Sequence, residues 1–97
     1  MVEVTQADRD ADQVRNIYRH RFEGPCPNND AVIDYSVEIE TIRVVMVEEI
    51  VEACVKARDL PKPYHENIAD YLFERFGGRQ RMVAFHHGVE IETRRGP

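Results

Sequence analysis

The chain has 97 residues, of which 42% are hydrophobic and 32% charged, and its formal net charge is −5 at pH 7. This balance predicts one globular domain and argues against a general binder of the nucleic-acid phosphate backbone. We find no apolar run of membrane-spanning length and no cationic leader, so we expect a cytoplasmic protein without a membrane partner.

The first part of the chain predicts an arm followed by two strands. Residues 1–12 are polar and acidic without a sustained period, and we interpret them as a flexible N-terminal arm before a single domain at 13–97. Imperfect alternation over residues 14–22 indicates a strand with one basic face. Apolar and polar residues alternate over 33–40, which predicts a second strand with one buried face and one solvated face.

Two helices are predicted next. Apolar residues at helical spacing form a stripe that should face the core; they are Val47, Ile50, Val51, Cys54 and Val55. This helix should stop before the LPKP segment at 60–63. A second helix should begin near Tyr64 and end at the glycines 77–78, where a left-handed backbone is easy for glycine. Its apolar face comprises Tyr64, Ile68, Leu72, Phe73 and Phe76.

The last segment, residues 83–93, alternates apolar and polar residues with the odd positions forming an apolar face. Gly88 interrupts it, which indicates either one long strand with a bulge or two strands. The order β-β-α-α-β(β) predicts an α+β fold in which an antiparallel sheet carries two helices on one face. The edges of such a sheet would be exposed, so we expect a homo-oligomer that closes into a ring.

The stretch FEGPCPNND, residues 22–30, places Cys26 between two prolines. Proline fixes its own φ and restricts the residue before it, so Cys26 should be held extended. A thiol held in this way, partly exposed in a loop, is suited to chemistry, although PNND is also a common surface turn. Cys54 should instead pack in the core as a small hydrophobe. Two cysteines are too few for a disulfide scaffold, so we expect both to be thiols.

Four segments, taken in order, resemble one protein family. FEGPCP, followed by an aspartate and by IDYSVEIET, resembles the nucleophile segment of the 7-cyano-7-deazaguanine reductases, which have the tunnelling fold (T-fold). The later matches are Val47-Glu48 at the first helix, Tyr64-His65-Glu66 at the second, and Phe85-His86-His87-Gly88 in the last strand. Together these segments cover residues 20–93.

The resemblance implies a reaction centred on Cys26. Its thiolate would attack the nitrile carbon of 7-cyano-7-deazaguanine and form a covalent thioimide. Asp30 would donate the proton to the nitrile nitrogen, although the family has a longer interval between the two residues. Asp30 also fits a simple role as a turn former in PNND.

The resemblance also implies a set of substrate-binding residues. Glu66 would accept the paired N–H donors of the guanine-like edge, with His65 beside it. Glu48 and His87 would complete the substrate site. Residue types alone leave simpler roles open, because Glu66 fits the first turn of a helix and His87 fits an apolar strand face.

The first helix departs from the family at the segment that holds dinucleotide phosphates. The reductases have a Ser-Lys-Ser type run there, whereas this chain has Glu49, Ile50 and Val51. A carboxylate repels phosphate, so we expect no NADPH cofactor. The pattern favours relatives in which ammonia attacks the thioimide and gives an amidine on a transfer RNA base. Whether the base is free or bound to tRNA stays open.

Two other classes of function fit part of the pattern. Histidines 65, 86 and 87 with Cys26 include the donor types of a zinc site, as in T-fold pterin enzymes, although adjacent histidines on a strand point to opposite faces. A non-catalytic purine-binding oligomer is the other alternative. The arginines near both ends of the domain could follow a nucleic-acid backbone or form a solvated face.

Overall fold

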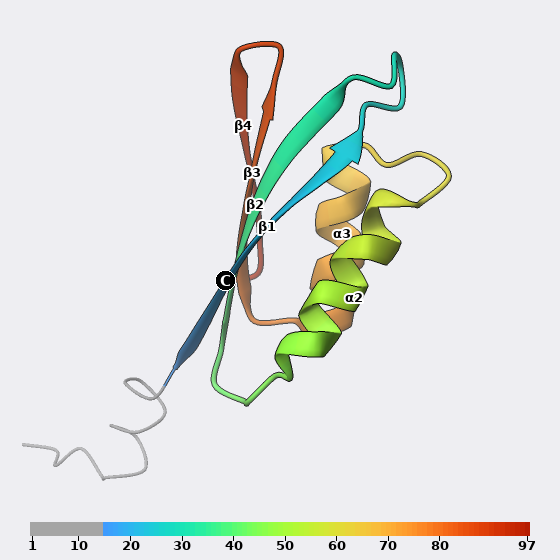
Figure 1. Ribbon diagram of the computed structural model, residues 1–97. Helices are drawn as coiled ribbons and strands as arrows, with labels where there is room; N and C mark the ends of the chain where they lie inside the picture. Colours follow the sequence, from blue (N-terminus) through green and yellow to red (C-terminus); the bar gives the residue numbers. More distant parts are fainter. Residues whose placement is uncertain (1–14) are drawn as a thin grey trace, which may run out of the picture.

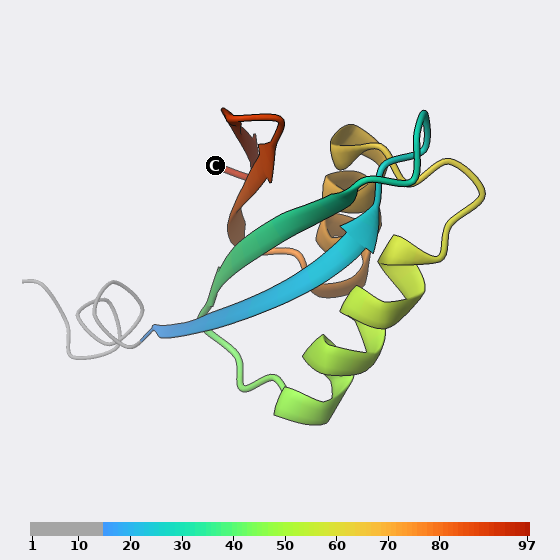
Figure 2. The same ribbon diagram turned by 45° about the horizontal axis from the view of Figure 1, so that its top comes forward.

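The computed structural model of the chain describes residues 15–97 (Figure 1). They form an α+β fold, as predicted, whose elements are β1 (Asn16–Pro25), β2 (Val32–Thr41), α2 (Val47–Arg58), α3 (His65–Phe76), β3 (Arg79–His86) and β4 (Val89–Arg95). The four strands form one antiparallel sheet in the order β1-β2-β3-β4, and both helices cover the same face of it, as Figure 1 and Figure 2 show. The predicted arm at 1–12 lies outside the described residues.

Strand β2 is the centre of the core. Its residues from Ile33 to Ile39 alternate between buried and more exposed positions, which confirms the predicted strand. Tyr35 and Ile39 are among the largest fully buried side chains. The helix-facing side chains of β1 and β3 flank them, including Phe22, which stacks on Tyr35 with ring centroids 4.9 Å apart.

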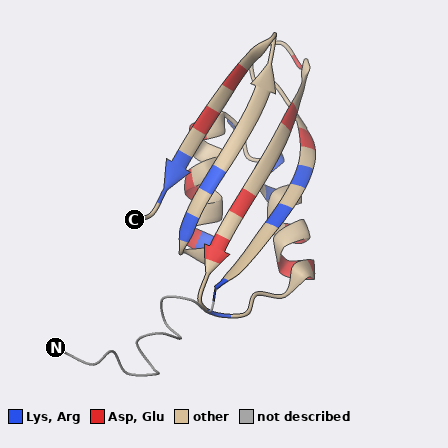
Figure 3. Ribbon diagram, turned by 90° about the vertical axis from the view of Figure 1, so that its left-hand side faces the viewer, with Lys and Arg blue, Asp and Glu red and all other residues tan. Residues whose placement is uncertain are grey.

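The other side of the sheet, here named the open face, carries charged residues on all four strands, drawn blue and red in Figure 3; they include Arg19, Glu38, Arg81 and Glu92. Arg19 lies 3.3 Å from Glu38, Arg81 lies 3.6 Å from the same carboxylate, and Arg81 also pairs with Glu92. These arginines have carboxylate partners, which favours the solvated-face interpretation over a phosphate-binding track. Such exposed pairs contribute little to stability.

Helix α2 buries part of the predicted face. Ile50 and Cys54 of the predicted stripe are buried together with Ala53 and Ala57, whereas Val47, Val51 and Val55 are 61%, 41% and 40% exposed. The end of the helix lies close to the sheet, since a Cβ at Gly24 of β1 would come within 3.1 Å of the Arg58 Cβ. The prediction was therefore right for Ile50 and Cys54 and wrong for the three valines.

Helix α3 agrees more closely with its prediction. Ile68, Leu72 and Phe76 are buried, with Ala69 beside them, while Tyr64 is 41% exposed. The end of the helix is fastened by Gln80, whose side-chain Nε2 donates to the carbonyl oxygens of Leu72 at 3.0 Å and Gly77 at 2.9 Å. Gln80 is itself buried, so these hydrogen bonds satisfy its amide nitrogen inside the core.

Strands β3 and β4 form a hairpin with the two-residue turn His87-Gly88. Both residues have positive φ, 52° and 79°, as a type I′ turn requires. The turn reverses the chain and sets which residues face the helices: Met82 and Ala84 are buried, while Phe85 is 52% exposed on the open face. The predicted apolar face at odd positions was therefore wrong before the turn.

Substitution of Gly78 should destabilise the fold strongly. Gly77 and Gly78 both have positive φ, and Gly77 with ψ −149° lies in a region that essentially only glycine adopts, so backbone strain at either position costs an alanine about 1–3 kcal/mol. A Cβ at Gly78 would also overlap the Glu40 carbonyl oxygen, whereas a Cβ at Gly77 would meet no heavy atom of the non-adjacent described residues within 4 Å. We expect Gly78→Ala to lose about 1–3 kcal/mol more than the matched Gly77→Ala, because overpacking adds to strain. Urea unfolding of both variants measures this; equal losses would contradict the close approach of Gly78 to the end of β2.

Candidate functional site

A pocket of about 80 Å³ lies where the loop after β1, the start of α3 and the β3-β4 hairpin meet. These three segments gather at one end of the molecule, at the top of Figure 1. The pocket is lined mainly by apolar atoms, and the lining residues that bear chemistry are Cys26, Tyr35, Tyr64, His65 and His86. Two of the predicted site residues, Cys26 and His65, are thus brought together although they lie far apart in the sequence.

Cys26 follows β1 and faces the helix side of the sheet. Its backbone N–H donates to the Ala31 carbonyl at 2.7 Å, and its carbonyl accepts from the Asp30 N–H at 2.9 Å. The residue is only 3% exposed, so the predicted partial exposure was wrong. The tight loop turns the sulfur inward to the wall of the pocket instead of outward to solvent.

Two side-chain contacts fasten the loop that follows Cys26. The Tyr64 hydroxyl donates to Asn28 Oδ1 at 3.0 Å, and Asn29 Nδ2 lies 3.2 Å from Nε2 of His87. Asn29 Oδ1 also accepts from the Ala31 N–H at 3.0 Å, which closes a local turn. The loop is therefore tied both to the start of α3 and to the tip of the hairpin.

Tyr35 contributes a phenol to the pocket. Burial raises the pKa of Tyr35 above its ordinary value, and the nearby Cys26 sulfur raises it further because an ionised thiol disfavours a phenolate. The hydroxyl group therefore stays protonated at neutral pH. For the second cysteine, burial raises the pKa of the Cys54 thiol to about 12, so Cys54 is a neutral core residue, as expected.

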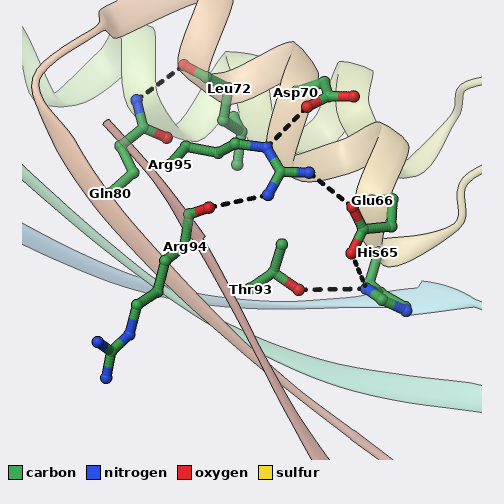
Figure 4. A network of polar contacts seen from close by, with 8 residues as sticks. All are labelled: His65, Glu66, Asp70, Leu72, Gln80, Thr93, Arg94 and Arg95. Atoms are coloured by element: carbon green, nitrogen blue, oxygen red, sulfur yellow. Dashed lines mark hydrogen bonds and ion pairs between the residues drawn. The ribbon is translucent and has the colours of Figure 1, made fainter. Parts of the chain in front are cut away.

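His65 lies at the first turn of α3 and is held through one ring nitrogen. Nδ1 is 3.1 Å from the Thr93 hydroxyl oxygen and 3.5 Å from a Glu66 carboxylate oxygen (Figure 4). Thr93 is buried on β4, so the contact fixes the ring against the sheet. His65 therefore lines the pocket in a defined orientation.

Glu66 does not line the pocket in this chain. Its carboxylate accepts a hydrogen bond from Arg95 at 2.7 Å, and the same guanidinium binds Asp70 at 2.7 Å (Figure 4). These hydrogen bonds raise the pKa of Arg95 and keep it charged. Glu66 is joined to the pocket through His65, its neighbour in sequence.

Three further predicted site residues also lie outside the pocket lining. Asp30 is exposed in the loop with a positive φ of 59°. His87 is exposed at the hairpin turn, where its ring contacts Asn29. Glu48 is exposed in the first turn of α2, which starts at the opposite end of the molecule from the Cys26 loop (Figure 1).

His86 lines the pocket, although the sequence interpretation gave it no role in the thioimide reaction and named it only as a possible zinc ligand. Its Nε2 is buried and has no hydrogen-bond partner among the described residues. The ring packs against His87 with centroids 4.2 Å apart. Adjacent residues on a strand point to opposite faces, so only one of His86 and His87 can face a site. His87 and Gly88 form the two-residue turn, which leaves His86 as the last residue of β3 and as the member that lines the pocket.

Within residues 15–97, no three side chains of His, Cys, Asp or Glu are grouped so that they could hold a metal ion. The described part of one chain therefore does not assemble the donor set of the zinc alternative. No helix within the same range has the length and apolar character needed to cross a membrane.

Comparisons of the chain with protein-family models, curated proteins and solved structures give no match. The functional inference therefore rests on the residues and geometry of this chain.

Proposed function

We propose that this chain is an enzyme that forms a thioimide between Cys26 and the nitrile of 7-cyano-7-deazaguanine. The observation that supports it most is the Cys26 thiol, held at a pocket that also contains imidazole and phenol groups. A nucleophilic thiol needs a fixed position and a nearby group that can move its proton. The pocket offers both, in the segment that resembles the family's nucleophile segment.

The proposed outcome is an amidine rather than an amine. Ammonia would add to the thioimide carbon and the Cys26 sulfur would leave, which regenerates the thiol without a redox cofactor. Reduction would need NADPH, and the residues that replace the phosphate-binding run are unsuited to it. Ile50 is buried in the core, and Glu49 carries a carboxylate that lies 3.9 Å from Arg75.

The test is to incubate the protein with 7-cyano-7-deazaguanine, free or on a transfer RNA, together with either ammonia or NADPH. We expect amidine with ammonia and no amine with NADPH. Formation of the amine would contradict the cofactor assignment. A reactive thiol also fits a reducing compartment, so we propose the cytoplasm as the location.

We further propose a T-fold ring in which a neighbouring copy completes the site. The pocket of one chain, about 80 Å³, is small beside the roughly 300 Å³ or more of typical ligand sites. The outer strands of the described sheet also carry opposite charges on the open face. On this face strand β1 has Arg19, Arg21 and Glu23, and strand β4 has Glu90, Glu92 and Arg94, so β1 is positive and β4 negative on balance. Head-to-tail pairing of these strands would therefore be electrostatically favourable.

The ring proposal predicts a multimer at micromolar concentration. Sedimentation velocity should give a single species several times heavier than the 11.3 kDa chain. A double charge reversal, Arg19→Glu with Arg21→Glu, should shift the distribution toward smaller species because it places like charges at the proposed contact. A parent protein that sediments as a monomer would contradict the ring.

Glu66 does not line the pocket of one chain, and we propose it as the anchor for the guanine-like edge in the larger site that a neighbouring copy completes. We expect Glu66→Gln to weaken ligand binding about tenfold or more, because the amide loses one acceptor and adds a donor. Asp70→Asn is the matched control, since Asp70 also binds Arg95 but has no contact with His65. Calorimetric titration measures both. Equal losses of affinity in the two variants would show that binding depends only on the ion pair that each carboxylate makes with Arg95, and would contradict Glu66 as the anchor.

A further inference from the structure

His86 has a polar atom that the protein itself leaves unused. The ring lies at the end of β3 on the helix side of the sheet and lines the same pocket as Cys26. Its Nε2 is buried without a hydrogen-bond partner among the described residues. Buried polar atoms in proteins are nearly always satisfied. An unpartnered, buried nitrogen on a residue that lines a pocket therefore points to a partner that arrives with a bound ligand or with the reacting thiol.

The two tyrosines at the pocket are hydrogen-bonded or unsuited to proton transfer, and His65 has one of its two ring nitrogens engaged. Tyr35 on β2 is kept protonated by burial and by Cys26, so it can donate a hydrogen bond but does not readily give up its proton. The Tyr64 hydroxyl is bound to Asn28. His65 on α3 uses Nδ1 to contact Thr93.

His87 and Asp30 are exposed and do not line the pocket. His87 uses its Nε2 to contact Asn29 at the hairpin tip. Histidine is the side chain type that changes charge between about pH 5 and 8 and can both accept and donate a proton in one reaction. Among the described pocket residues, His86 combines this chemistry with a buried nitrogen that has no partner.

We infer that His86 carries the proton in the reaction of Cys26, an inference that rests on the proposed function. Nε2 accepts the thiol proton as the sulfur forms its bond to the nitrile carbon. The nitrogen of the former triple bond gains an electron pair and takes that same proton from His86. The thiol is thus added across the carbon–nitrogen triple bond, with no oxidant or reductant. This assigns to His86 the donor role that the sequence suggested for Asp30.

The test compares His86→Gln with the parent and with His20→Gln, a control histidine on β1 outside the pocket lining. Glutamine retains a polar group near the position of Nε2 but cannot carry a proton. The rate of adduct formation with 7-cyano-7-deazaguanine is followed by intact mass between pH 5 and 9. We expect a bell-shaped rate profile for the parent. His86→Gln should be slower by about 100-fold and should lose the falling limb at high pH, whereas His20→Gln should stay within about twofold of the parent.

A second probe separates failure of this inference from failure of the proposed function. Iodoacetamide, with the modified residue located by peptide mapping, reports the reactivity of Cys26 without any nitrile. We expect His86→Gln to slow Cys26 alkylation at pH 7 by about tenfold, since the thiol loses its base. If the parent forms no nitrile adduct but alkylation still depends on His86, the proposed function fails and the role of His86 stands. Unchanged alkylation and an unchanged pH profile in His86→Gln would overturn the inference, and thermal unfolding of each variant verifies that it is folded.

Discussion

Replacing Cys26 by alanine should abolish covalent capture of 7-cyano-7-deazaguanine. The amount of adduct should fall below the detection limit of the mass measurement. In the proposed reaction the sulfur of Cys26, at the pocket wall, bonds to the nitrile carbon, so no slower route is expected once the thiol is removed. Intact-mass measurement after incubation with the ligand reads the result directly.

Cys54→Ala is the matched control for this experiment. Cys54 is 1% exposed and its pKa is raised to about 12 by burial, so it has almost no thiolate at neutral pH. The variant should retain the adduct and lose only about 1 kcal/mol of stability through a smaller core side chain. An adduct that persists in Cys26→Ala would contradict the assignment of the nucleophile.

Replacing Gln80 by glutamate should give a large loss of stability at pH 7. Gln80 Nε2 donates to the carbonyl oxygens of Leu72 and Gly77, so a carboxylate there would face two acceptors in a buried site. An uncompensated buried charge costs about 3–5 kcal/mol. Gln80→Met, which removes the donors without adding charge, should lose about 1–3 kcal/mol.

The loss in Gln80→Glu should depend on pH in a defined direction. Burial raises the pKa of the new carboxyl in the folded state above its unfolded value of about 4.3. Relative to Gln80→Met, the stability of Gln80→Glu is therefore highest below about pH 4 and decreases as pH rises through the raised folded pKa of the new carboxyl. Urea unfolding at several pH values should show Gln80→Glu approaching Gln80→Met in acid. A difference between them that does not change with pH would contradict the buried contact.

Local patterns predicted the elements well because each depends on nearby residues. Alternation over 33–40 was sufficient for β2, and the paired glycines 77–78 marked the end of α3. The face of α2 was not predictable in the same way. Hydrophobicity favoured the three valines, but the helix buries Ala53 and Ala57 in their place, because burial depends on packing against elements far away in the sequence.

The site was predictable only in part for a similar reason. The prolines around Cys26 and the position of His65 before a helix were visible in the sequence, and both residues line the pocket. The pairing of Glu66 with Arg95 joins residues 29 positions apart and left no local signal. His86 was present as half of a histidine pair, and only the turn geometry at His87-Gly88 decides which half faces the pocket.

The most direct test of the central proposal is the intact mass of the parent protein after incubation with 7-cyano-7-deazaguanine under native conditions and acid quenching. Thiol addition to a nitrile loses no atoms, so the mass should increase by the full mass of the ligand, with peptide mapping placing the increase on Cys26. Addition of ammonia before the quench should remove the adduct as amidine forms. A mass that does not change, with the protein folded and the thiols reduced, would contradict the proposed function.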